Sequence, residues 1–274
     1  MILRSLAWRT DLIFPRFDGE ILDRGHYLVI RTPSNPTFYW GNFLLFDRPP
    51  APGDEERWPR LFAEEIGAPP QVQHQTFGWD SPEGDAAAAH AFVERGFRLI
   101  HSSVLTASSV SPPPRESTEI AVRTLESDED WRQATENQIR CRDPDHREAG
   151  YRVFKEAEMR RYRAMALAGR GAWFGAFLGG TLVADLGIYQ DESLGRFQTV
   201  ETHPDFRRRG YAGTLVFKAA RHALGQMGVE TLVLVADADS AAERLYSSVG
   251  FLPREQEVGL ERWWSPAGGS ENSS

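Results

Sequence analysis

A turn with three arginines and a glycine, Arg207-Arg208-Arg209-Gly210-Tyr211-Ala212, joins a predicted strand to a predicted helix. Residues 196–202 alternate as a strand does, and apolar side chains recur at helical spacing from Leu215 to Met227. A strand that turns through glycine into a helix presents unpaired backbone N–H groups and the positive end of the helix dipole. This unit predicts an anion site, and the arginines favour a phosphate.

The residues before the turn, 196–202, are expected to form one strand of a sheet. Simple alternation places Phe197, Thr199 and Glu201 on one face of the sheet and the residues between them on the other. Pro204 lacks a backbone N–H and restricts the residue before it, so the strand is expected to fail or bulge near there.

A second strand and helix follow the first helix. Residues 231–236 form a continuous apolar run of strand length, which is typical of a strand buried on both faces. Asp237 to Ser240 supply turn and N-cap chemistry for a helix over residues 241–249, and Gly250-Phe251 end it.

Two spaced motifs in this region carry a family resemblance. The first is Arg-x-x-Gly-x-Ala at Arg207 to Ala212, and the second is Asp239-x-x-Ala242-x-x-Leu245-Tyr246-x-x-x-Gly250-Phe251. Together they resemble the signatures of the GCN5-related N-acetyltransferases (GNAT), over residues 117–264. The turn fits neither the nucleotide-triphosphate loop nor the dinucleotide fingerprint. The resemblance implies an α/β fold with a mixed sheet, in the order β-α-α-β-β-β-α-β-α-β.

The resemblance also implies a site for acetyl-CoA as co-substrate. The pyrophosphate is expected on the turn, and the pantetheine arm on the backbone of Val200 and Thr202. One of their N–H groups, freed by a bulge or a splayed strand, is expected to polarise the thioester. The expected cofactor-binding residues are Val200, Thr202, Arg207, Arg208, Arg209, Gly210, Tyr211, Ala212, Gly213 and Asp239.

Two residues are expected to carry the chemistry. Tyr246 matches the family position whose phenol protonates the departing sulfur, although it also lies on the apolar stripe of its helix. Glu201 is the candidate base, acting directly or through water. His203 and Asp237 remain alternatives to Glu201, and residues 131–170 are expected to line the acceptor pocket.

The chain divides at a Ser/Pro-rich segment. We expect a smaller α/β domain over residues 1–107, a linker over 108–116, a catalytic domain over 117–264 and a disordered tail over 265–274. The expected strands of the first part cover 26–31, 38–46, 72–79 and 98–107, and the expected helices cover 55–66 and 86–95.

The first part is interpreted as a degenerate GNAT-like unit. Aligning Gly96-Phe97 with Gly250-Phe251 places Phe92 on Tyr246, so the phenol is lost. After the strand ending near Phe46, three prolines replace the arginine turn. The alternative is an unrelated α/β cap with a chance Gly-Phe match. If the repeat is real, the chain has two related units but one active centre.

Charge and composition limit the partners. The formal net charge of −8 argues against nucleic-acid binding, because phosphate neutralisation needs a basic surface. No apolar segment reaches bilayer length, so no membrane insertion is expected, and a cytoplasmic location is the default. The single Cys141 can form neither an internal disulfide nor a thiolate metal cluster, and no metal is expected. A monomer or homodimer is expected.

The predicted function is acetyl transfer from acetyl-CoA to a primary amine by direct attack in a ternary complex. The acceptor is expected to be a small-molecule or peptide amine. Two alternatives stay open at this point: a non-catalytic acyl-CoA-sensing module, and an aminoacyl transferase of related tandem architecture that uses charged tRNA.

Overall fold

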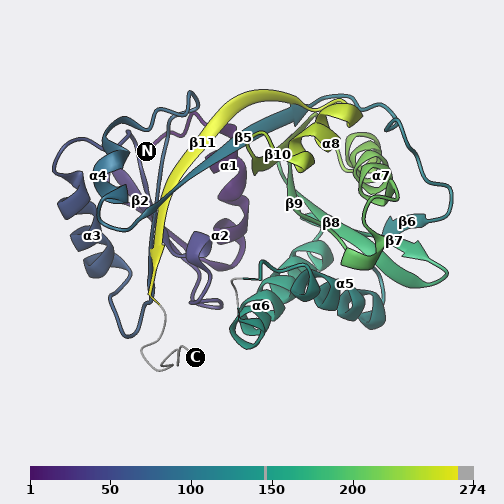
Figure 1. Cartoon of the computed structure of the whole chain (residues 1–274), viewed down its shortest axis with the longest axis horizontal. Helices are drawn as coiled ribbons and strands as arrows, with labels where there is room; N and C mark the ends of the chain where they lie inside the picture. Colours follow the sequence, from purple (N-terminus) through teal and green to yellow (C-terminus); the bar gives the residue numbers. More distant parts are fainter. Residues whose placement is uncertain (145–146, 265–274) are drawn as a thin grey trace, which may run out of the picture.

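The fold is built around one large sheet, seen in a computed structural model that describes residues 1–144 and 147–264. Eleven strands of the described residues join in the order β1-β2-β3-β4-β11-β5-β10-β9-β8-β7-β6, and helices cover both faces (Figure 1). This mixed α/β architecture confirms the predicted fold class. The tail predicted over residues 265–274 lies outside the described residues.

The elements follow the chain in two comparable series. The first series is α1 (Leu6–Asp11), α2 (Ile13–Asp18), β1 (Glu20–Asp23), β2 (Tyr27–Arg31), β3 (Phe43–Phe46), α3 (Asp54–Glu65), β4 (His74–Trp79), α4 (His90–Val93) and β5 (Arg98–Ala107). The second is β6 (Ala121–Thr124), α5 (Asp128–Arg140), α6 (Glu148–Leu167), β7 (Gly171–Leu178), β8 (Thr181–Asp191), β9 (Leu194–Thr202), α7 (Tyr211–Gln226), β10 (Thr231–Asp237), α8 (Ala241–Val249) and β11 (Leu252–Trp263).

The last strand of each series lies beside the strands of the other. β5 pairs antiparallel with β10, and β11 pairs antiparallel with β4. The two exchanged strands also pair with each other, from Thr106 opposite Leu252 to Arg98 opposite Glu261. Apart from the extra edge strand β6, the strand order is symmetric about this central pair, and both β3/β4 and β9/β10 are parallel. Two copies of one unit that exchange their last strands would give this order.

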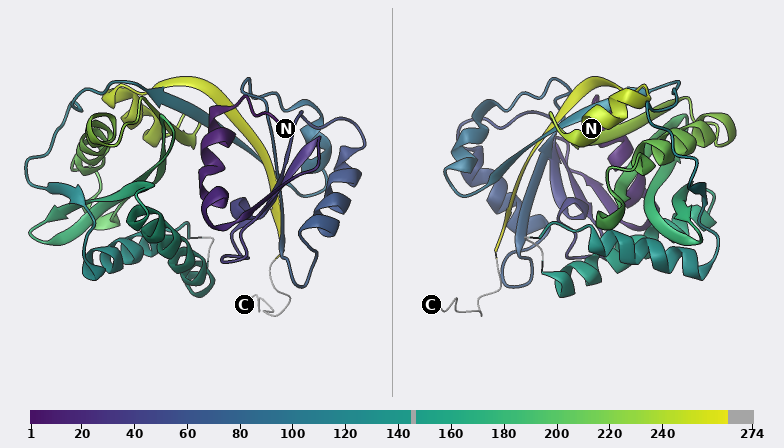
Figure 2. Two further views of the ribbon diagram at one scale, coloured as in Figure 1. Left: turned by 180° about the vertical axis from the view of Figure 1, so that it is seen from behind. Right: turned by 45° about the vertical axis from the view of Figure 1, so that its right-hand side comes forward.

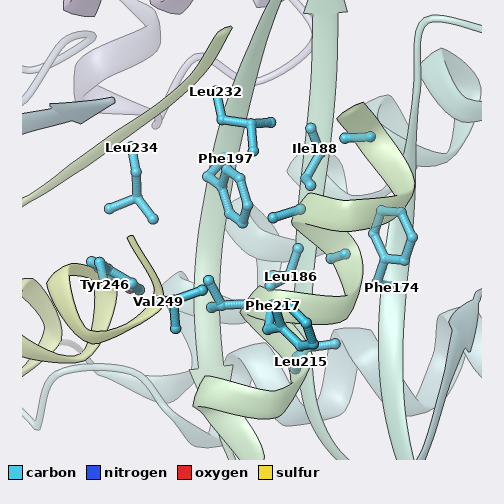
Figure 3. Packing of buried hydrophobic residues seen from close by; sticks show 14 of the residues in the cluster. Phe174, Leu186, Ile188, Phe197, Leu215, Phe217, Leu232, Leu234, Tyr246 and Val249 are labelled. Carbon is cyan, nitrogen blue, oxygen red and sulfur yellow. The ribbon is translucent and has the colours of Figure 1, made fainter. Parts of the chain in front are cut away.

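Separate apolar clusters fill the two faces of the sheet. On one face α7 and α8 pack on β8, β9 and β10 through Leu215, Phe197 and Leu234 (Figure 3). On the other face α5, α6 and α2 pack on β7 and β8 around Trp173 and Tyr189. Viewed from behind, α1 and α2 lie between the other elements of the first series and the second series (Figure 2). α1 contacts both β9 and β10.

The sequence missed α1 and α2, and the structure shows why. Each helix has six residues, which is too short for a periodic apolar pattern. The first N–H groups of α1 are satisfied by distant carboxylates: Asp80 Oδ1 accepts from Ser5 N and Glu255 Oε2 accepts from Leu6 N, both at 2.8 Å. The start of this helix therefore depends on tertiary contacts.

Another expectation in the first part is wrong. Residues 38–46 do not form one strand, because Tyr39–Gly41 form a 3-10 turn before β3 starts at Phe43. The aromatic rings hold this turn: Tyr39 stacks on His74, and Trp40 lies against Gly259, where a Cβ atom would lie 2.4 Å from the indole.

A β-bulge interrupts β9 and corrects the predicted alternation. Gln198 lies opposite Gly187 and Glu201 lies opposite Asp185, so three steps along β9 match two along β8. Thr199 takes a positive φ of 31° within the bulge. Glu201 therefore shares the α5 face of the sheet with Gln198, and not the α7 face with Phe197.

The segment predicted as a linker packs against the second series. Ser111 N donates to the Val249 carbonyl at 2.9 Å, and Ser117 N donates to Thr214 Oγ1 at 2.8 Å. Between them the carbonyl of Arg115 lies beside Gly210, where a Cβ atom would approach it to 2.7 Å. The segment thus crosses the end of α8 and the start of α7.

A capping box fixes the start of α5, the helix that later presents polar groups to the bulge. Ser127 accepts from Asp130 N, and Asp130 accepts from Ser127 N and from the guanidinium of Arg123 at 2.7 and 2.8 Å. The hydrogen bonds from Arg123 hold the pKa of Asp130 well below its ordinary value.

We predict that Asp130→Asn lowers the free energy of unfolding at neutral pH by about 1–2 kcal/mol. Because the folded-state pKa of Asp130 is depressed, its stabilisation is complete above the ordinary pKa of 3.8 and is lost as the pH falls below it. Urea unfolding at pH 7 and at pH 3 checks this. An equal difference at both pH values would contradict the charge assignment.

We also predict that neither half folds alone. A fragment of residues 1–107 leaves β5 without β10 and β11, and a fragment of residues 108–274 leaves β10 without β5. Thermal unfolding of each fragment, followed by near-ultraviolet circular dichroism, should show no cooperative transition, whereas the co-expressed fragments should restore one. A cooperative transition in either isolated fragment would overturn this.

Candidate functional site

The predicted anion turn has the geometry of an open helix N-terminus. Gly210 is the N-cap of α7 in the left-handed conformation, with φ 84°, and Arg208 also has a positive φ of 62°. No side chain caps the helix. Among the described residues, no acceptor receives a hydrogen bond from the backbone N–H groups of Arg208 to Gly213. This set of free donors is suited to bind an anion.

The arginines of the turn surround these donors. Arg207, Arg208 and Arg209 are all exposed, and Arg207 Nε donates to the Thr202 carbonyl at 3.1 Å, which ties the turn to the end of β9. Tyr211 differs from its predicted neighbours: its ring is buried and its hydroxyl donates to Glu119 Oε2 at 2.8 Å. Only the backbone of Tyr211 belongs to the turn.

The strands on either side of the turn separate. β9 and β10 pair only over Leu194–Arg196 and Thr231–Val233, so from Phe197 onward the β10-facing edge of β9 has no strand partner. Val200 and Thr202 lie on this unpaired stretch, and the bulge at Thr199 precedes them. A ligand with amide groups can pair with a strand edge of this kind.

Glu201 lies at the end of this opening, on the α5 and α6 face. Burial raises the pKa of its carboxyl group, and the charge of Lys155 and the thiol of Cys141 oppose that increase. Asp185 is its cross-strand neighbour and is fully buried. A carboxyl group with a raised pKa, close to the strand opening, has the chemistry of a general base.

Tyr246 comes from the other side, on α8. Its ring packs beside Leu234 and Val249 (Figure 3) and contacts the edge of Phe251. Burial raises the pKa of its phenol, and the charge of Glu201 raises it further. The hydroxyl has no hydrogen-bond partner among residues 1–144 and 147–264. At neutral pH Tyr246 is thus a protonated, unengaged phenol within the electrostatic reach of Glu201.

The other sequence-predicted candidates are engaged elsewhere or lie at the margin. His203 Nδ1 accepts from Asp205 N at 3.2 Å, and Arg140 Nη1 lies 2.6 Å from its Nε2, so both ring nitrogens have neighbours. Burial and the charge of Arg140 lower its pKa. The side chains of Asp237 and Asp239 are exposed, and the Asp239 carbonyl accepts from Arg244.

The structure adds residues that the sequence analysis did not place in the site. Lys155 on α6 is buried, with a raised pKa, and its Nζ lies 2.5 Å from Glu158 Oε2. Asp185 accepts hydrogen bonds from Asn137, Gln138 and Trp173. Burial raises the pKa of Cys141 to about 12, so its thiol stays protonated. The predicted acceptor region of residues 131–170 covers most of α5 and α6 and so includes Lys155. Asp185 lies outside that region.

The first series of elements contains a counterpart of the anion turn that is filled. Gly53, with φ 94°, is the left-handed N-cap of α3, as Gly210 is of α7. Here, however, Glu55 Oε2 accepts from Gly53 N at 2.8 Å and Asp54 Oδ2 accepts from Ala51 N at 2.9 Å. At this turn the carboxylates of Asp54 and Glu55 accept backbone N–H groups that could otherwise bind an external anion.

The position equivalent to Tyr246 in the first series lacks a hydroxyl group. Phe92 on α4 is buried and contacts Phe97 edge-on, as Tyr246 contacts Phe251, and in each pair the second residue donates its N–H to the carbonyl of the first at 3.1 Å. The helix ends match, with Gly96 and Gly250 both at positive φ. The local geometry is the same, but the phenol is absent.

Within the part of the chain that the structure describes, no helix is both long and apolar enough to cross a bilayer. Among the same residues, no group of three or more histidine, cysteine, aspartate or glutamate side chains is arranged to hold a metal ion.

A known family resembles the second part of the chain. The profile of the family described as the acetyltransferase (GNAT) family matches residues 131–251, which include the turn, Glu201 and Tyr246. No curated protein matches the chain.

Solved structures share the fold over nearly the whole chain. A conserved protein of unknown function from Staphylococcus epidermidis aligns with a TM-score of 0.65 and 12% identity, covering 90% of this chain and 95% of that one. A GCN5-related N-acetyltransferase from Kribbella flavida aligns with a TM-score of 0.63 and 16% identity, over 96% and 97%. A tandem GNAT protein from the clavulanic acid biosynthesis pathway aligns with a TM-score of 0.52 and 14% identity, over 94% and 88%.

Proposed function

Because the profile of the acetyltransferase (GNAT) family matches residues 131–251 of this chain, we propose that the protein transfers an acetyl group from acetyl-CoA to a primary amine. The observation that carries this proposal is the opening between β9 and β10. It has an uncapped, arginine-rich helix N-terminus at one end, and Glu201 and Tyr246 approach it from opposite faces of the sheet.

The turn and the strand edge supply the binding contacts. The N–H groups of Arg208 to Gly213 cradle the pyrophosphate, and the exposed arginines add charge-assisted hydrogen bonds. The amides of the pantetheine arm pair with the free edge of β9 at Val200 and Thr202. A backbone N–H released by the bulge polarises the thioester oxygen. Asp239, at the start of α8, is the outermost cofactor contact.

The transfer itself is direct attack in a ternary complex. Glu201 accepts the proton of the acceptor ammonium, directly or through water, and the free amine then attacks the thioester carbon. As the C–S bond breaks, the phenol of Tyr246 gives its proton to the sulfur, so that coenzyme A leaves as a thiol. The acceptor is proposed to bind on the α6 side of the opening, near the buried ion pair of Lys155 and Glu158.

One active centre is proposed for each chain. In the first series the turn at Gly53 is filled by Asp54 and Glu55, and Phe92 replaces the phenol. A second anion would displace these carboxylates only against their charge repulsion. The first series is proposed to be a degenerate copy over residues 1–107, and the active copy covers residues 117–264.

The binding step is tested with acetyl-CoA and a charge-reversed turn. We predict one bound acetyl-CoA per chain by calorimetry, with at least about tenfold weaker binding in Arg208→Glu, because a charge-assisted contact becomes repulsive. Arg221→Glu makes the same exchange on the exposed side of α7, away from the turn, and should bind as the wild type does. Equal binding in all three proteins would exclude the turn as the pyrophosphate site.

The transfer step is tested by the release of free coenzyme A thiol with a panel of primary amines. Release with at least one amine supports the acetyltransferase, whereas tight acetyl-CoA binding without release from any amine favours the sensing module. Transfer that requires charged tRNA and not acetyl-CoA would favour the aminoacyl transferase.

For Tyr246→Phe we predict a kcat reduced by about 10²-fold or more with an acetyl-CoA Kd within about twofold of the wild type, since the change removes one proton donor and leaves the ring packing intact. Steady-state kinetics and calorimetry measure the two constants. Phe92→Tyr, which adds the phenol to the first series, is the matched control and should leave kcat unchanged. An unaltered kcat in Tyr246→Phe would remove this residue from the mechanism.

A further inference from the structure

Among the residues that the structure describes, no cation pairs with the buried carboxylate of Asp185. Its side chain is fully buried, yet each of its hydrogen bonds comes from a neutral donor: Asn137 Nδ2 at 2.7 Å, Gln138 Nε2 at 2.6 Å and Trp173 Nε1 at 3.0 Å. A neutral residue could accept from the same donors without the cost of burying a charge. The structure therefore keeps an ionisable group where packing does not require one.

Asp185 is connected to the bulge through one of these donors. Gln138 Nε2 donates both to Asp185 Oδ1 and to the carbonyl of Thr199, at 3.0 Å, the residue with positive φ in the bulge. A strained φ at a non-glycine residue persists only where its surroundings fix it. The hydrogen bond from Gln138 on α5 restrains the Thr199 backbone on the side of β9 that carries Glu201.

Asp185 also lies directly opposite Glu201 across the β8–β9 ladder. Side chains opposite each other on one face are close neighbours, and like charges there repel. The charge of Glu201 contributes to the raised pKa of Asp185, after burial as the main cause, and this pKa is about 7. The repulsion is mutual, so ionisation of Asp185 increases the proton affinity of Glu201.

Other charged or titratable groups face the same pair from every surrounding element. They come from the end of α5, from α6, from the turn and from α8: Cys141, Tyr151, Lys155, Arg207 and Tyr246. The cations Lys155 and Arg207 lower the pKa of Glu201. Asp185 lies on the same face of the sheet as Glu201, and its negative charge acts against these cations.

We propose that Asp185 is a positioning residue for the acetyl transfer, which holds the Thr199 bulge through Gln138 and places a second negative charge beside Glu201. It cannot touch the substrate, because it is fully buried. The role in transfer rests on the proposed function, but the coupling between the two carboxyl groups does not.

The coupling can be measured without turnover. The indole N–H of Trp173 donates to Asp185, so its ¹H–¹⁵N NMR signal should move with pH with a midpoint of about 7, and Trp173→Phe identifies the signal. In Asp185→Asn the shift should disappear. In Glu201→Gln the midpoint should fall by about one pH unit, since a neighbouring negative charge is removed. An unchanged midpoint in Glu201→Gln would overturn the proposed coupling whatever the protein catalyses.

The effect on transfer is measured by the pH dependence of kcat/KM. The ratio of wild type to Asp185→Asn should rise on the order of tenfold as the pH increases through 7, because only the wild type gains the second charge that makes Glu201 more basic. Deprotonation of the acceptor amine is common to both proteins and cancels in the ratio. A ratio that stays constant with pH would show that Asp185 acts in packing alone.

Two matched variants separate the parts of the proposal. Asp130→Asn makes the same chemical change at the capping box of α5, and should lower stability while keeping the wild-type pH dependence of kcat/KM. Gln138→Met keeps the volume but removes the donor to both Thr199 and Asp185. It should lower kcat, and the pH-dependent ratio to the corresponding Asp185→Asn double variant should persist with a higher midpoint, because the hydrogen bond from Gln138 lowers the pKa of Asp185. A Gln138→Met enzyme with full kcat would exclude the link to the bulge. If acetyl-CoA binds and no amine is acetylated, the proposed function fails while the NMR test of the coupling still stands.

Discussion

The antiparallel pairing of β5 with β11 is the constraint on which the other contacts depend. Each strand ends its own half of the chain and lies next to the other half, so their backbone hydrogen bonds close the centre of the sheet. Two acidic residues from different halves accept the first N–H groups of α1: Asp80, which follows β4, and Glu255, which lies in β11. The candidate active site belongs to the second half, but the β10 strand that forms one side of its opening is held by β5 of the first.

The opening between β9 and β10 follows from two local features of the strands. The parallel pair stops after Arg196 and Val233, and the bulge at Thr199 then turns the following residues. The same bulge carries Glu201 to the face where α5 and α6 supply Gln138 and Lys155. The free strand edge and the position of the candidate base thus follow from these two features of β9, while the anion turn comes from the start of α7.

Much of the architecture could be predicted because its signals are local. The apolar run of β10, the helical stripe of α7 and the glycines that end α8 lie close together in the sequence, and the structure places these elements as expected. The anion turn is similarly local, since Gly210 and the arginines are consecutive. What failed depends on distant partners: α1 is capped by Asp80 and Glu255, and the alternation of β9 was broken by a bulge whose register is set by β8. Asp185 could not be found for the same reason, because its donors come from α5 and β7.

The segment between the halves gives the anion turn a wider role. It starts where β5 ends, passes α8 through Ser111 and reaches the start of α7, with the Arg115 carbonyl beside Gly210. The conformation of the turn with its free N–H groups therefore packs against the segment that continues from β5. A ligand that binds this conformation and not the open chain shifts the folding equilibrium by mass action. If the turn binds the proposed cofactor, its occupancy therefore also stabilises the central strand pair, and the ligand then helps to hold both halves of the chain together.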